Sequence, residues 1–269
     1  MTATKTAPKA PGTAVIKWAD QLAAEATIAA KSEAATATGS FFSTKSGVLS
    51  FGGNPVPGNA MAVVILDTIN ENTLYEGKFN PNEMAPPTCF AFGRGDDEMA
   101  PHEVSVKAGS AQSDNCAGCE HNEWGSADTG RGKACSNKRR LAMLPAGTID
   151  NGRIKLFTRA SDFETGSIGF LKLPVTSVKG YASFVKQVAA GLHRPPHGIF
   201  AKVSVVSDAS SQFKVAFEVI GEIDDEFMGA IMQRREEAQA GIMSPYSAPG
   251  AEEKAPARKG AAAPKKKKF

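Results

Sequence analysis

The sequence predicts a mainly β domain with a small number of helices, in the α+β class. Short apolar or alternating segments follow one another along the chain, and clusters of Gly, Pro, Asn and Asp separate them. Strands and helices do not alternate in the regular way that a βαβ fold requires. With 269 residues, 42% of them hydrophobic, the chain can bury a sizeable core as one large domain or two small ones.

The N-terminal part is expected to lie outside the β domain. Residues 1–15 are rich in Thr, Ala, Pro and Lys, a composition typical of disorder. Residues 16–38 are Ala-rich with a thin apolar stripe, which predicts a helix docked on the surface. A mitochondrial presequence is the alternative, but Asp20, Glu25 and Glu33 argue against it because such presequences carry few acidic residues.

The β domain is expected to span residues 39–241, and its best strand candidate is Ala60–Ile69. This segment is a nearly continuous apolar run rich in β-branched residues, which is typical of a buried strand. The sequence Asp150-Asn-Gly152 indicates a hairpin-type turn. The other expected strands are Ser46–Phe51, Arg140–Pro145, Arg153–Thr158 and Ile168–Leu173, followed by the hairpin of Ile199–Val206 and Phe213–Ile220.

One helix is expected inside the domain, from Thr176 to Ala190, with Gly191 as its C-cap. Its apolar side chains recur three or four positions apart, so they should share the face that packs on the sheet. These residues are Val178, Tyr181, Val185 and Val188.

A second helix is expected to begin after a cap at Asp224 and to end at Gly241. Residues 242–269 are rich in Pro, Ala and Lys, so we expect a disordered tail. From Glu252 to Phe269 seven Lys or Arg and two Glu give a charge of +5, which leaves −2 for residues 1–251 of a chain with net charge +3. Such a tail attracts phosphate regardless of sequence.

About seven strands with short turns favour a small antiparallel barrel or sandwich. We expect an OB-like Greek-key barrel, with flanking helices and disordered termini. An insertion at about residues 86–138 would separate its second and third strands. The strand count alone does not distinguish the OB type from other barrels.

This insertion contains every cysteine of the chain: Cys89, Cys116, Cys119 and Cys135. A C-x2-C pair with distant further cysteines has the spacing of a zinc site. Four thiolates close a tetrahedral shell, so one structural Zn²⁺ is expected, whereas a catalytic zinc needs an open position.

The alternatives at this site are two disulfides, a redox C-x-x-C motif, free thiols, or a histidine in place of one cysteine. No signal peptide is evident, so we expect a reducing, cytoplasmic compartment, where structural disulfides are rare. His102 and His121 are the histidines within reach, and we expect both to be loop residues.

A basic run within the insertion is the clearest electrostatic feature of the expected folded part. It holds five cations and no acid in ten residues, which is typical of a phosphate-binding surface, although a solvated loop is the alternative. The cations are Arg131, Lys133, Lys138, Arg139 and Arg140.

Aromatic residues lie near this basic run, as single-strand binding by stacking requires. Trp124 precedes the run, and Tyr75, Lys78, Phe90 and Phe92 lie on the approach to it. For the two phenylalanines, packing of the small zinc core is an equal alternative.

Catalysis is not expected, and we identify no catalytic residues. The phosphate-loop, zinc-protease and serine-hydrolase motifs are missing from the sequence. The acidic cluster Asp96–Glu98 could hold Mg²⁺ in a nuclease, but one cluster in an irregular segment makes no two-metal site. No apolar run approaches the roughly 18 residues that span a membrane, so a soluble protein without a membrane partner is expected.

Residues 74–144 resemble a family of bacteriophage proteins found beside replication genes. The shared features are Tyr75, Pro87-Thr88-Cys89, Cys116-x2-Cys119, Trp124-Gly125-Ser126, Gly132-Lys133-Ala134-Cys135 and Arg139-Arg140. A zinc element set in an OB barrel is also similar to the single-stranded DNA-binding protein of T-even phages, although that protein has a mixed His/Cys shell and an acidic tail.

The resemblance implies a single-stranded DNA-binding protein of phage replication or recombination, in the host cytoplasm. RNA remains possible as a ligand, and replication or recombination proteins as partners. The alternative is a zinc-ribbon adaptor that binds a polymerase or recombinase and touches nucleic acid only through its basic tail.

Overall fold

The computed structural model describes residues 40–77, 85–96, 98–150 and 153–246, together with the helical residues Leu22 and Glu25. The expectations for the N-terminus, for Lys78 and for most of the basic tail lie outside these residues. The described chain ends at Tyr246, four residues past the expected start of the tail at residue 242.

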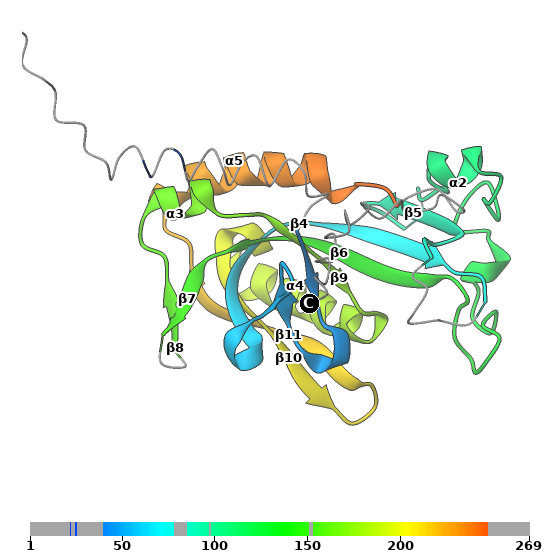
Figure 1. The fold of residues 1–269 in the computed structure, drawn as a ribbon, viewed down its shortest axis with the longest axis horizontal. Helices are drawn as coiled ribbons and strands as arrows, with labels where there is room; N and C mark the ends of the chain where they lie inside the picture. The colour runs from blue at the N-terminus through cyan, green and yellow to red at the C-terminus, as the bar shows by residue number, and fades with distance from the viewer. Residues whose placement is uncertain are drawn as a thin grey trace, which may run out of the picture.

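A curled, half-barrel sheet dominates the fold (Figure 1). Its strand order is β11-β10-β4-β6-β9-β1-β2-β3, and β5 pairs with β4. All neighbours are antiparallel except β1 and β9. The strands are β1 (Ser40–Ser43), β2 (Ser50–Phe51), β3 (Asn54–Pro55), β4 (Ala60–Leu74), β5 (Cys89–Gly93), β6 (Ser136–Pro145), β9 (Gly169–Leu173), β10 (Ile199–Asp208) and β11 (Gln212–Glu222).

A separate two-stranded sheet is formed by β7 (Gly147–Asp150) and β8 (Arg153–Leu156). The mixed, β-rich class expected from the sequence is therefore confirmed, and so is the hairpin of β10 and β11. In the described sheet β11 and β3 stand at opposite ends of the strand order. An OB-type barrel stays a prediction.

Helices cover both faces of the sheet. On one face α4 (Val175–Leu192) packs Tyr181, Phe184 and Val188 into the core. The other face is covered by α3 (Ala160–Thr165) and α5 (Asp225–Ile242), which lies along the sheet in Figure 1. The remaining elements are α2 (Glu103–Lys107), η1 (Lys45–Gly47), η2 (Pro57–Asn59), η3 (Glu120–Asn122) and η4 (Pro196–Gly198).

Helices pack on both faces of β4, and this explains why its sequence is a continuous apolar run. Val63 and Ile65 pack towards α4, while Val64 and Leu66 pack towards α5. A strand with helices on both faces has no solvent side, so its sequence does not alternate. The prediction of a buried strand at Ala60–Ile69 is confirmed, and β4 extends it to Leu74.

The expected strand Ser46–Phe51 is wrong except for its last two residues, which form β2. The chain turns there through η1, with Ser46 at φ 56° and Gly47 at φ 75°. Asn59 holds this turn, because its side chain accepts from the Leu49 amide at 2.5 Å and donates to the Gly47 carbonyl at 2.7 Å. A Cβ at Gly47 would also meet the Phe213 ring at 2.3 Å, so glycine is needed for space as well as conformation.

The insertion arises at one end of a long ladder between β4 and β6. Their pairing runs from Val63 with Pro145 to Thr73 with Ser136, so β6 begins four residues before the expected Arg140. We call residues 85–96 and 98–135 the cysteine lobe. It contains β5 and α2, and Figure 1 shows it at one end of the sheet, away from the β7–β8 hairpin.

Candidate functional site

The ends of β5 and β6 bring Cys89 and Cys135 to the same place. Cys89 begins β5 and pairs with Leu74, the last residue of β4. Cys135 immediately precedes Ser136, which pairs with Thr73 on the opposite edge of β4. Two cysteines 46 positions apart in the sequence thus flank the end of one strand.

Hydrogen bonds hold the C-x2-C segment against these strand ends. The Cys116 amide donates to the Met99 carbonyl at 2.8 Å, and the Asn122 side-chain amide donates to the Cys116 carbonyl at 2.7 Å. The Cys135 amide donates to the His121 carbonyl at 2.8 Å. The C-x2-C turn is therefore linked to the start of β6 through His121 and Asn122.

The four cysteines are free thiols, and together they line a cavity of about 20 Å³. Burial, and after it repulsion from the other three cysteines, raises the pKa of Cys135 to about 12. Burial likewise raises the pKa of Cys89 and of Cys116. Ionised thiols in this position need a cation to offset both burial and mutual repulsion.

This donor set fits Zn²⁺, whose structural sites take four thiolates. Within the described residues no three His, Cys, Asp or Glu side chains are already arranged as a metal-binding group. His121 also lines the cavity. His102 is engaged elsewhere: its Nδ1 accepts from the Val104 amide at 3.2 Å, and its ring stacks on Phe90.

Trp124 is the most exposed large apolar side chain of the described chain, at 81%. The Lys133 Nζ lies 5.7 Å from the centre of its ring and 3.2 Å from the Asn122 side-chain oxygen. A cation thus lies next to an indole ring that is largely open to a ligand. Arg131 is exposed in the same loop.

A polar cavity of about 230 Å³ lies beside this pair, on the side of the sheet that α4 covers. We call it the amide cavity. Three asparagine side chains, two cations and one carboxylate line it: Asn72, Asn122, Asn137, Lys133, Arg139 and Asp96, with Val178 of α4.

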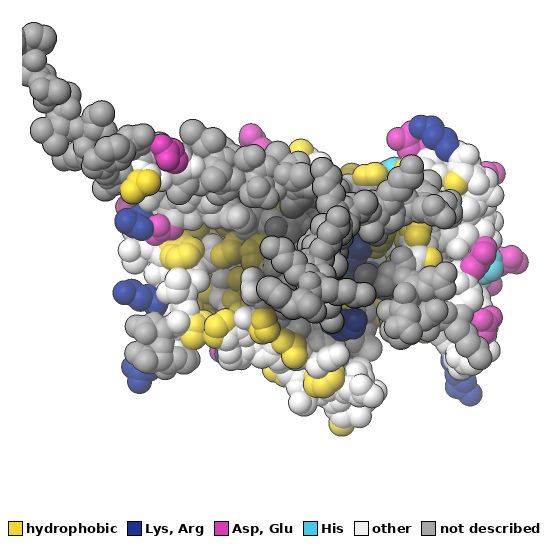
Figure 2. All heavy atoms as spheres, in the orientation of Figure 1, with side chains coloured by type: hydrophobic (Ala, Val, Ile, Leu, Met, Phe, Trp, Pro, Cys, Tyr) yellow, Lys and Arg dark blue, Asp and Glu magenta, His cyan; other side chains and the backbone are white. Residues whose placement is uncertain are grey.

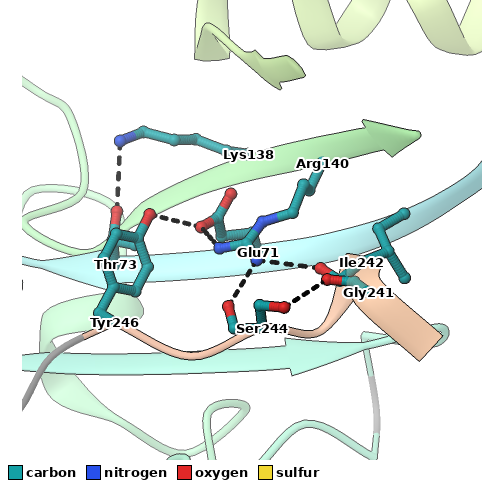
Figure 3. A network of polar contacts seen from close by, with 8 residues as sticks. All are labelled: Glu71, Thr73, Lys138, Arg140, Gly241, Ile242, Ser244 and Tyr246. Carbon is teal, nitrogen blue, oxygen red and sulfur yellow. Dashed lines mark hydrogen bonds and ion pairs between the residues drawn. The ribbon is translucent and has the colours of Figure 1, made fainter. Parts of the chain in front are cut away.

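Arg140 does not fit the phosphate-binding role expected for it. Its side chain is 2% exposed, and its Nη2 lies 2.6 Å from Glu71 Oε1 (Figure 3). Its Nη1 donates to the carbonyls of Ile242 and Ser244, and the Tyr246 hydroxyl donates to Glu71 at 2.5 Å. Successive strand residues face opposite sides, so Arg140 points to α5 whereas Arg139 points to the amide cavity.

Phe90 is 1% exposed, which favours the packing alternative for it. Its ring stacks on His102 and contacts Phe92, which is half-buried beneath the Arg140 guanidinium at 4.3 Å. Neither Phe90 nor Phe92 therefore presents an open face comparable with that of Trp124.

Tyr75 and Lys138 form a second aromatic–cation pair, on the side of β4 and β6 that faces α5. Tyr75 is 46% exposed, and the Lys138 Nζ lies 5.8 Å from its ring and 3.2 Å from Thr73 Oγ1. Burial lowers the pKa of Lys138, while the nearby Glu71 carboxylate raises it.

Sequence reasoning missed Lys172 and Tyr246 on this side. The Lys172 Nζ lies 4.0 Å from the centre of the Tyr246 ring and 4.9 Å from that of Phe41. Burial lowers the pKa of Lys172 to about 8. Its only signal in the sequence is a single cation within the apolar strand Gly169–Leu173. In Figure 2 a few Lys and Arg side chains lie between an apolar area below α5 and the cysteine lobe.

The chain matches no protein-family model, and neither a curated protein nor a solved structure matches it. In the part of the chain that the structure describes, every helix is too short or too polar to cross a membrane.

Proposed function

We propose that this protein binds single-stranded nucleic acid, with single-stranded DNA as the expected ligand and a structural zinc in the cysteine lobe. The exposed Trp124 beside Lys133 carries the proposal. Base stacking on an aromatic face next to cations that follow the phosphates is the chemistry of sequence-tolerant single-strand binding.

The binding face is the side of the cysteine lobe and β6 that carries Trp124, Lys133 and Arg139. Arg131 is exposed nearby and adds a fourth contact. Tyr75 and Lys138 lie on the opposite face, so only a nucleic-acid strand long enough to pass around the end of β4 and β6 reaches both pairs. The proposal does not depend on an OB-type barrel, because these side chains belong to the lobe and to one strand.

Zinc has a structural role in this proposal. Cys89, Cys116, Cys119 and Cys135 would hold it, and it supplies the cross-link that fixes polar loops without a core of their own. The loop between Cys119 and Cys135 carries Trp124, Arg131 and Lys133, so the metal would fix the binding residues in place.

The test is a pair of titrations with single-stranded and double-stranded oligonucleotides at several salt concentrations. Replacing Arg131 by Gln should lower the slope of log affinity against log salt by about 0.7, because the variant no longer neutralises one phosphate. Lys107→Gln is the matched control in the same lobe, because Lys107 is exposed and pairs with Glu103 at 2.7 Å.

The adaptor alternative is separated by a chain that ends at Gly250. Single-strand binding by this shortened chain supports the proposal, since the basic tail is then gone. If it binds neither substrate at low salt, the folded part is not the binder, and the zinc-ribbon adaptor should replace the proposal.

A further inference from the structure

We propose that the amide cavity binds one guanine base of the nucleic-acid strand. This inference rests on the proposed function and names the base that the site selects. The cavity of about 230 Å³ is several times the roughly 30 Å³ that a water molecule occupies in the liquid. It adjoins the Trp124–Lys133 pair through Lys133, so a base inside it would neighbour one stacked on the indole.

The three asparagine amides hold one another in fixed orientations. The Asn137 Nδ2 donates to Asn72 Oδ1 at 2.7 Å and to Asn122 Oδ1 at 3.0 Å. Asn122 uses its own amide nitrogen on the Cys116 carbonyl. Both hydrogens of the Asn137 amide are therefore engaged, and its Oδ1 is left as an acceptor, without a partner in the described chain.

Asp96 supplies a second acceptor. Its Oδ1 accepts from the Asn70 amide at 2.6 Å, which orients the carboxylate, and its Oδ2 has no partner among the described residues. The donors are Arg139 and Lys133. Arg139 uses only its Nη1, on the Lys138 carbonyl at 3.2 Å, and Lys133 has two N–H groups beyond the one given to Asn122.

Guanine matches this set of two acceptors and two cationic donors. Its N1–H and N2–H₂ groups are adjacent donors, which a carboxylate can accept together, and its O6 and N7 are adjacent acceptors, which arginine binds in bidentate fashion. Adenine, cytosine and thymine each offer only one donor group at their pairing edge. Each would therefore make fewer hydrogen bonds to the cavity than guanine does and should bind more weakly. A phosphate fits less well because Asp96 repels it.

The experiment uses the full chain and oligothymidylates of about 16 nucleotides. One central position carries thymine, guanine, adenine, hypoxanthine or 7-deazaguanine. Guanine should bind about 10-fold more tightly than thymine or adenine, as a good bidentate contact provides. Hypoxanthine lacks the N2 amino group and 7-deazaguanine lacks N7, so each should lose part of this gain.

Asp96→Asn should abolish the preference for guanine over hypoxanthine, while Glu98→Gln in the same loop is the matched control and should keep it. Arg139→Gln should abolish the preference for guanine over 7-deazaguanine. Equal affinity for all five oligonucleotides, or a guanine preference that both variants retain, overturns the inference and leaves single-strand binding intact. Failure to bind any of the oligonucleotides overturns both.

Discussion

Arg140 and Glu71 form an ion pair inside the protein, with Nη2 2.6 Å from Oε1 and side chains 2% and 0% exposed. The pair joins neighbouring strands, and Arg140 also binds the Ile242 and Ser244 carbonyls at the end of α5 (Figure 3). Arg140 therefore links the C-terminal end of α5 to β4 and β6, the two strands that flank the cysteine lobe in the sequence.

Glu71→Gln should destabilise the protein by about 3–5 kcal/mol, because Arg140 would keep a buried charge without its counter-ion. Glu218→Gln is the control: the Lys202–Glu218 pair spans 3.0 Å with side chains 36% and 65% exposed, so its loss should cost about 0–1 kcal/mol. Urea denaturation measures both free energies of unfolding. Equal losses for the two variants would show that the buried pair has no special role.

The untagged protein should contain one zinc per chain. Cys89→Ser or Cys135→Ser should each lose the metal, whereas His121→Ala should keep it. Chelation should speed amide hydrogen exchange over about residues 86–135, while β10 and β11 stay protected because their core is independent of the lobe. Metal analysis and hydrogen exchange provide the readouts. Full zinc occupancy in Cys89→Ser would contradict the four-cysteine shell.

Trp124→Ala should weaken single-strand binding by about 1–3 kcal/mol with little change in salt slope, because stacking releases no counter-ions. Stability should be almost unchanged, since this side chain is 81% exposed. Phe213→Ala is the control for loss of an exposed aromatic ring outside the lobe. A Trp124 variant that alters only the salt slope would show that the indole does not stack on bases.

Lys172 should make stability depend on pH between about 8 and 10.5, the range between its folded pKa and its ordinary value. Burial is the main cause, and Arg140 and Lys138 also lower the pKa whereas Glu71 raises it. In this range the unfolded chain binds a proton that the folded chain does not, so the contribution of Lys172 becomes more favourable as pH rises.

Lys172→Met should therefore stabilise the protein most below pH 8, and its advantage should disappear by about pH 10.5. Urea titrations at several pH values measure the difference. Lys179→Met, at an exposed position on α4, is the control and should show the same small effect throughout. A constant advantage of Lys172→Met across this range would exclude titration of Lys172 as its source.

The sequence alone determines the features that depend on local pattern. The apolar run from Ala60 predicted a buried strand. The structure confirms it, because both faces of this strand contact helices. Trp124 stands between Glu123 and the pair Gly125-Ser126, neighbours that favour an exposed side chain, and it is 81% exposed. The spacing of the cysteines predicted a shared site, and all four thiols do line one cavity, although zinc itself stays a prediction.

Tertiary structure alone decides what neighbouring side chains do. Arg139 and Arg140 are adjacent and chemically identical, but β6 alternates, so one lines the amide cavity and the other is buried against Glu71. Glu71 lies 69 positions away in the sequence, and no local pattern links it to Arg140. The amide cavity likewise combines β4, β6, the lobe and α4. Which residues meet there depends on strand register and long-range packing, which sequence periodicity does not contain.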